Sequence, residues 1–166
     1  MSMFFNLFAA AAAEGDPGDR PTGADHRFAE VVEQSLFQLW RPGDPIPQHA
    51  VRLLIGVASS SGCDMRLLDV IAEAMDRGPS ALPTVDVFDT ADCPRPEDFR
   101  RYIPTLRDVA HTPVAGIWFG GQLTWRGQGH TARDQIARMF GATSEQIIEY
   151  VRQWSQARTR PEGARR

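Results

Sequence analysis

The sequence predicts an α/β protein with a central mixed β-sheet of about four strands that is flanked by helices. Residues 51–58 form an apolar run of strand length, which is typical of a strand buried on both faces. A helical pattern follows at residues 64–75, and a second strand is expected at residues 84–88. Residues 114–126 add two strands joined by a Gly-Gly pair at 120–121, which suits the turn of a β-hairpin.

Length and composition fit one domain of ordinary size with a buried core. The chain has 166 residues, of which 42% are hydrophobic and 23% are charged, as in globular proteins. No apolar stretch approaches the ~20 residues that cross a bilayer, so no membrane span is expected. Two cysteines, Cys63 and Cys93, are too few for a disulfide scaffold or a four-cysteine zinc site.

The charge of the chain argues against nucleic acid as a partner. The net charge is −3, and five arginines between residues 152 and 166 make the C-terminal tail basic while the remainder is acidic. Such a body has too few basic residues to neutralise a phosphate backbone. All 18 basic residues are arginine, which excludes chemistry that depends on a Schiff-base or phosphate-binding lysine.

Helices are expected before the first strand and between the second strand and the hairpin. Apolar residues recur at a roughly helical period from Phe28 to Trp40, behind a candidate N-cap at Asp25. Residues 94–109 predict a helix that is broken by Pro104.

Two further helices are expected after the hairpin. Thr131 and Asp134 resemble a capping box with an apolar stripe behind them. Residues 144–154 carry apolar side chains on one side and predict an additional C-terminal helix. The predicted segments are a domain at 26–141, the extra helix at 142–157 and a basic tail at 158–166.

The first 25 residues predict two segments outside the domain. Residues 1–13 are apolar and lack the basic residue that precedes the apolar run of a signal peptide. We therefore expect an arm that docks on a partner or on the protein's own body, and a cytoplasmic location; the alanines leave a cleaved signal peptide as the alternative. Residues 14–25 are rich in Gly, Pro and Asp and predict a flexible linker.

This order of elements resembles the thioredoxin family over about residues 50–141. In that family a proline held in cis opens the strand before the hairpin, and a glycine precedes the last helix. Pro113 and Gly129 stand in those places. The resemblance implies that Thr112 and Pro113 form one wall of a groove for an extended peptide, and residues 60–64 the other. The alternatives are a plain trans proline and a related α/β fold.

The family's redox dithiol is absent from this chain. Working members carry Cys-x-x-Cys where the helix after the first central strand begins, and this stretch holds one cysteine. One register places Ser60 and Cys63 at the two cysteine positions, and the other places Ser61 and Asp64 there. Counting from Ser61 puts apolar residues at the expected buried positions of the helix, whereas counting from Ser60 puts mostly charged residues there. The second register is favoured, so ordinary disulfide reductase activity is not expected.

The resemblance therefore implies a thioredoxin-fold protein that binds a protein segment, as an adaptor, a maturation chaperone or a subunit of a larger assembly. The binding residues that it implies are Ser60, Ser61, Gly62, Asp64, Thr112 and Pro113. The arm at residues 1–13 and the helix at residues 144–154 are further candidate contact surfaces. The alternative function is a single-thiol redox protein with Cys63 as the catalytic residue, since the first turn of a helix favours a thiolate. A packed, inert Cys63 is the competing interpretation.

The remaining polar and aromatic residues form no clear site. No two histidines stand four residues apart, so neither a metal nor a cofactor is expected; the four are His26, His49, His111 and His130. Three aspartates lie around the end of the second strand: Asp86, Asp89 and Asp92. We expect them to be solvated there, and a divalent-cation site is the less favoured alternative. Packing between strands is favoured over ligand stacking for Trp118 and Trp125.

Overall fold

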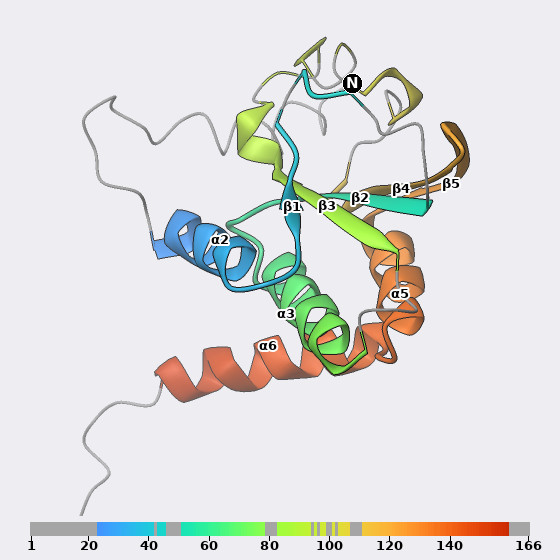
Figure 1. The fold of residues 1–166 in the computed structure, drawn as a ribbon. Coiled ribbons are helices and arrows are strands. Elements are labelled where there is room, and N and C mark those ends of the chain that lie inside the picture. Colours follow the sequence, from blue (N-terminus) through green and yellow to red (C-terminus); the bar gives the residue numbers. More distant parts are fainter. Residues whose placement is uncertain are drawn as a thin grey trace, which may run out of the picture.

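An open five-stranded mixed sheet forms the centre of the protein in its computed structural model (Figure 1). The structure describes residues 23–41, 43–45, 51–78, 83–93, 95, 97–98, 101, 103–106 and 111–159. The arm at 1–13, most of the linker at 14–25, half of the segment at 94–109 and most of the basic tail lie outside these residues. No helix within the described ranges is both long enough and apolar enough to cross a membrane.

The strand order is β1-β3-β2-β4-β5. The strands are β1 (Gln38–Leu39), β2 (Val51–Val57), β3 (Thr84–Asp89), β4 (Val114–Phe119) and β5 (Gln122–Gln128). β1 and β2 run parallel to β3, whereas β4 runs antiparallel to both β2 and β5. Five consecutive residues of β2 are buried, which explains its nearly continuous apolar sequence.

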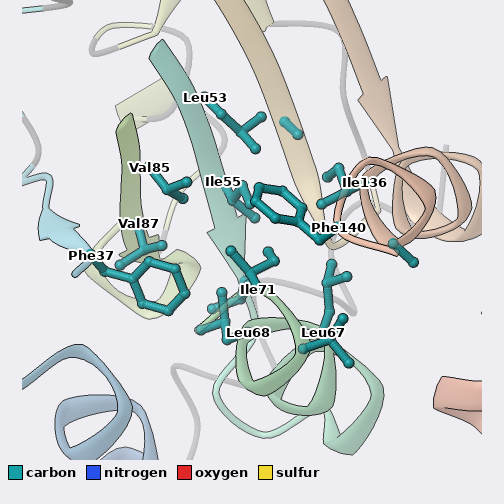
Figure 2. Packing of buried hydrophobic residues seen from close by; sticks show 14 of the residues in the cluster. Phe37, Leu53, Ile55, Leu67, Leu68, Ile71, Val85, Val87, Ile136 and Phe140 are labelled. Atoms are coloured by element: carbon teal, nitrogen blue, oxygen red, sulfur yellow. The ribbon is translucent and has the colours of Figure 1, made fainter. Parts of the chain in front are cut away.

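Four helices are described, and they lie on one side of the sheet (Figure 1). They are α2 (Gly23–Glu33), α3 (Gly62–Arg77), α5 (Gly129–Met139) and α6 (Ser144–Thr159). Their apolar faces meet alternate residues of the central strands, and Figure 2 shows Ile71 of α3 beside Ile55 of β2, with the Phe140 ring between Ile55 and Ile136 of α5. This face holds the larger part of the core.

A smaller core covers the other face of the sheet. It contains Trp40, Leu54, Phe88, Cys93, Ile103, Leu106, Val114 and Trp118. Trp40 meets Phe88 edge to face, with ring centroids 5.2 Å apart. Short 3₁₀ turns at Thr90–Asp92 and Pro104–Leu106 supply part of this layer. In the segment where a broken helix was expected, residues 97, 98 and 101 are helical, and Pro104 begins a separate 3₁₀ turn.

The prediction of one helix from Phe28 to Trp40 is wrong. α2 ends at Glu33, and the chain then forms the fifth strand, β1, at the edge of the sheet. Phe37 packs into the larger core and Trp40 into the smaller core on the opposite face. A spacing of three residues places side chains on opposite faces of an extended chain, although it also fits a helix. Asp25 lies inside α2 rather than at its N-cap.

The capping box expected at Thr131 is also wrong, because α5 begins two residues earlier. Gln128 is its N-cap and makes no side-chain capping bond. A capping box instead opens α6, where the Gln146 amide donates to Thr143 Oγ1 at 3.3 Å. In return the Thr143 amide donates to Gln146 Oε1 at 2.9 Å. The C-terminal helix begins as predicted and continues five residues further, to Thr159.

The β-hairpin at the end of the sheet is confirmed. Gly120 and Gly121 have φ values of 56° and 80°, which glycine adopts readily and which the two-residue turn requires. A bulge after Ile117 offsets the pairing, so that Ile117 faces Trp125 across the strands. The two tryptophans consequently pack on opposite faces of the sheet, with Trp118 in the smaller core and Trp125 against the larger one.

Candidate functional site

The candidate site lies where β2 ends and α3 begins. Ser61 is the N-cap of α3, with extended φ and ψ values of −89° and 114°, and its Oγ accepts the Asp64 amide proton at 3.3 Å. Serine is among the residues preferred at this position because its short side chain can reach an unpaired amide of the first turn. The N-cap Ser61 therefore marks the point after β2 at which α3 begins.

The phase of α3 agrees with the register that starts from Ser61. Leu67 and Ile71 are fully buried and Val70 is nearly so. On the other side of the helix, Arg66 pairs with Glu73 at 3.1 Å and both reach solvent. Counting from Ser60 would have placed Arg66 and Glu73 in the core, which the structure excludes.

Asp64 is completely buried in the first turn of α3. Its Oδ2 accepts the Ala58 amide proton at 3.0 Å, and the nearby side chains of Thr112 and Ser61 favour its charged form. Arg133 on α5 attracts the charge from further away. Burial outweighs these favourable contacts and raises the pKa of Asp64 above its usual value.

Replacing Asp64 with asparagine is expected to stabilise the protein at neutral pH. The raised pKa means that the folded protein binds the carboxyl proton of Asp64 more tightly than the unfolded chain does. Proton binding by Asp64 therefore stabilises the fold, and this contribution is fully present below about pH 3.9. That contribution is lost as the pH rises through the folded pKa. Urea unfolding across this range should therefore show Asp64→Asn gaining stability over the wild type with rising pH. A constant difference would contradict this assignment.

Thr112 and Pro113 lie beside this carboxyl, at the start of β4. Their peptide bond is cis, as the resemblance implies, and Pro113 is buried. The Pro113 carbonyl accepts the Gly129 amide proton at 2.9 Å, which joins the strand to the start of α5. Across the ranges that the structure describes, neither the N–H nor the C=O of Thr112 forms a backbone hydrogen bond. Among the described residues, the main-chain donor and acceptor of Thr112 thus have no backbone partner.

The other predicted site residues differ in their exposure. Ser60 is exposed, and Cys63 is half-buried against the larger core. Gly62 is exposed but lies close to α6, because a methyl group added there would be 3.3 Å from Cγ1 of Val151. The structure therefore places Ser61, Gly62, Asp64, Thr112 and Pro113 around one end of α3, with Ser60 at its margin.

Two contacts between α6 and α3 were not predicted. Tyr150 stacks under the guanidinium of Arg66, with 4.1 Å between the Arg66 Cζ atom and the ring centroid. Val151 packs over Gly62. The sequence shows the apolar stripe of the C-terminal helix, but no local pattern predicts which helix this stripe packs against. The extra helix therefore braces the start of α3.

Cys93 cannot act as a resolving partner for Cys63. It is fully buried in the smaller core, whereas Cys63 packs against the larger core on the opposite face of the sheet. Burial and the nearby charges of Asp92 and Asp98 raise the pKa of Cys93 to about 11. Both cysteines are free thiols.

Alkylation is expected to leave Cys93 untouched in the native protein. At pH 8 a pKa of about 11 makes the thiolate about 200-fold scarcer than in an unfolded chain, where the pKa is about 8.5, and burial slows the reaction further. Iodoacetamide labelling with and without urea, followed by mass spectrometry, measures this ratio, with Cys63 as the internal comparison. Equal labelling of Cys93 in both conditions would show that the smaller core opens readily.

The interpretation of the aspartates as a solvated strand end is wrong for two of them. Asp86 is buried and accepts two bonds from Arg52, at 2.7 and 2.9 Å. Asp89 is buried and accepts the Ala91 amide proton at 3.0 Å. Asp92 is exposed. The carboxylates of Asp86 and Asp89 have structural partners, and the described part of the chain contains no group of three or more potential metal ligands.

Fold and site together define an α/β protein with an open mixed sheet and a cluster of polar groups where its central strand meets a helix. No protein-family model matches the chain, and the search of curated proteins finds no match either.

Proposed function

We propose that this protein is a thioredoxin-like module without dithiol chemistry that binds an extended segment of a partner protein beside α3. The observation that carries the proposal is that the main-chain N–H and C=O of Thr112 form no backbone hydrogen bond with any residue that the structure describes. An extended segment can pair with such groups as an added strand. The strand order and the buried proline before β4 support the same family resemblance.

Disulfide exchange is disfavoured by the residues at the start of α3. Ser61 and Asp64 stand at the positions of the two family cysteines, and exchange requires a second thiol to resolve the mixed disulfide. Cys93 is on the wrong face of the sheet for that role. The partner is therefore bound rather than reduced, as expected of an adaptor, a maturation chaperone or a structural subunit.

A tethering experiment tests the groove with a short synthetic peptide in place of the partner. In a Cys63→Ser background, Ser61→Cys places a thiol at the proposed groove, and the buried Cys93 is left in place. The probe is a five-residue apolar peptide with a central cysteine, compared with cysteamine as a small thiol. Two main-chain hydrogen bonds contribute about 1.4 kcal/mol together. The mixed disulfide with the peptide should therefore withstand about a tenfold higher concentration of competing β-mercaptoethanol than the mixed disulfide with cysteamine.

The matched control is Ser60→Cys in the same background, since Ser60 is exposed and only one residue away. It should hold the peptide and cysteamine equally well. Methylating the peptide's main-chain amides should abolish the preference at Ser61→Cys. Equal retention of peptide and cysteamine at Ser61→Cys would refute peptide binding at this site.

Single-thiol chemistry at Cys63 is the second candidate function, and the half-buried position of Cys63 in the first turn of α3 favours it. Incubation with glutathione disulfide should then give a stable mixed disulfide at Cys63. Mass spectrometry that finds no adduct would remove this alternative.

A further inference from the structure

α6 has an apolar side that continues beyond its contact with α3. Ile147 on this side is 1% exposed, and Val151 lies close to Gly62, the first residue of α3. Tyr150 and Trp154 lie on the same side, because residues three, four or seven positions apart share one side of a helix. They are 43% and 45% exposed, although both are large and aromatic. Figure 1 shows α6 crossing α3 and extending past it, so these two residues define an aromatic end of α6 that α3 leaves partly uncovered.

The start of α2 lies within side-chain reach of this aromatic end. Arg27, in the second turn of α2, pairs with Asp69 of α3 at 2.6 Å. The same Asp69 oxygen lies 3.9 Å from Nη1 of Arg66. The Arg66 guanidinium in turn stacks on Tyr150, with 4.1 Å between Cζ and the ring centroid. These contacts connect α2 to α6 across α3, so the chain that precedes α2 enters the helical layer close to Tyr150.

The chain before α2 can bring an apolar segment onto α6. Residues 1–13 contain no charged residue and include Phe4, Phe5 and Phe8. Nine residues, 14–22, separate this arm from α2, and nine extended residues span up to about 30 Å. α6 has 16 residues and is therefore about 24 Å long, so the spacer can place the arm anywhere along it. Covering the aromatic end of α6 with the phenylalanines removes apolar surface from water on both partners.

We propose that residues 1–13 fold back within the same chain and cover the aromatic end of α6. The arm is uncharged and therefore matches this end rather than the opposite side of the helix, where Glu149 pairs with Arg152. The arm thus docks on the protein's own body and not on a partner. Arm docking does not require peptide binding beside Thr112, because the two use different residues.

Photocross-linking from the arm in the full chain measures where the arm lies. p-Benzoylphenylalanine in place of Phe5 reacts with the C–H groups that it touches, and mass spectrometry of tryptic fragments identifies the attached residues. We expect attachment at or beside Tyr150 and Trp154. Unlabelled and isotopically heavy protein, mixed in urea and refolded together, distinguish a cross-link within one chain from a cross-link between two copies.

Two substitutions on α6 separate this contact from nonspecific adhesion. Trp154→Ser should lose most of the cross-link to α6, because the arm then covers much less apolar surface. Ile148→Ser is the matched control and should keep the cross-link. Ile148 is 49% exposed on the same helix, but it lies about 120° around the helix from Trp154. If circular dichroism shows that Trp154→Ser does not fold, Phe4→Ser combined with Phe8→Ser changes the arm instead and should also lose the cross-link.

Each outcome supports or overturns docking within the chain. A cross-link to α6 inside one chain that is lost in Trp154→Ser and kept in Ile148→Ser supports it. A cross-link to α6 between heavy and unlabelled copies would overturn it and would identify a second copy as the occupant. Attachment at another exposed apolar residue such as Phe119, attachment nowhere on the protein, or equal loss in both serine variants would also overturn it.

Discussion

Replacing Gly56 with alanine is expected to destabilise the protein by about 3 kcal/mol or more. A methyl group at this position would lie 2.3 Å from Cζ of Phe88 and 2.7 Å from Cγ2 of Val114. Phe88 is fully buried and is held edge to face by Trp40. Because Gly56 lies in the central strand β2, neither the ring nor the strand can move away without disturbing the smaller core.

Urea unfolding measures this effect, and Gly78→Ala provides the control. Gly78 follows α3, and a methyl group there would meet no atom within 4 Å, so its stability should change by less than about 1 kcal/mol. Adding Phe88→Leu to Gly56→Ala should recover part of the loss, since the smaller side chain vacates the contact. A Gly56→Ala protein as stable as the wild type would mean that the packing around Phe88 is looser than the structure indicates.

Removing Asp86 is expected to cost about 3–5 kcal/mol, because it would leave the Arg52 guanidinium largely buried without its counter-charge. The two side chains are 17% and 8% exposed, and the Arg52 Nη2 atom lies 2.7 Å from Asp86 Oδ1. Arg52 also donates to Gln38 Oε1 at 2.8 Å. The ion pair therefore links β2 to β3 and reaches β1 at the edge.

The test compares the free energy of unfolding of a single variant, which loses one member of the ion pair, with that of a double variant, which loses both. Asp86→Ala alone should lower the free energy of unfolding strongly, whereas Arg52→Met combined with Asp86→Leu should be nearly neutral, because it leaves no uncompensated buried charge. Glu149→Ala is the control, since its pair with Arg152 is exposed and contributes about 0–1 kcal/mol. If Asp86→Ala and Glu149→Ala had equal effects, the Arg52–Asp86 pair would be as solvated as a surface pair.

The sequence predicted the elements whose signals are local. The apolar run of β2, the helical pattern of α3 and the Gly-Gly turn each appear within a few consecutive residues, and each is present in the structure. The choice of Ser61 over Ser60 as the residue at the family's first cysteine position was equally local, because it depends on the 3.6-residue period of one element. Local signals do not show that residues from two distant segments lie together. The sequence could therefore place Ser61, Asp64, Thr112 and Pro113 in one candidate site only through the family resemblance.

The elements that the sequence missed depend on contacts between distant parts of the chain. β1 spans two residues and exists because β3 offers a free edge to pair with. Asp86 carries no local sign that it will be buried, since its partner Arg52 lies on another strand. The packing of Val151 over Gly62 joins residues almost ninety positions apart. Periodicity within one segment determined the helices, the longer strands and the hairpin of this protein. Only the tertiary structure decided what each face buries, because burial is set by whichever partner covers that face and not by the segment itself.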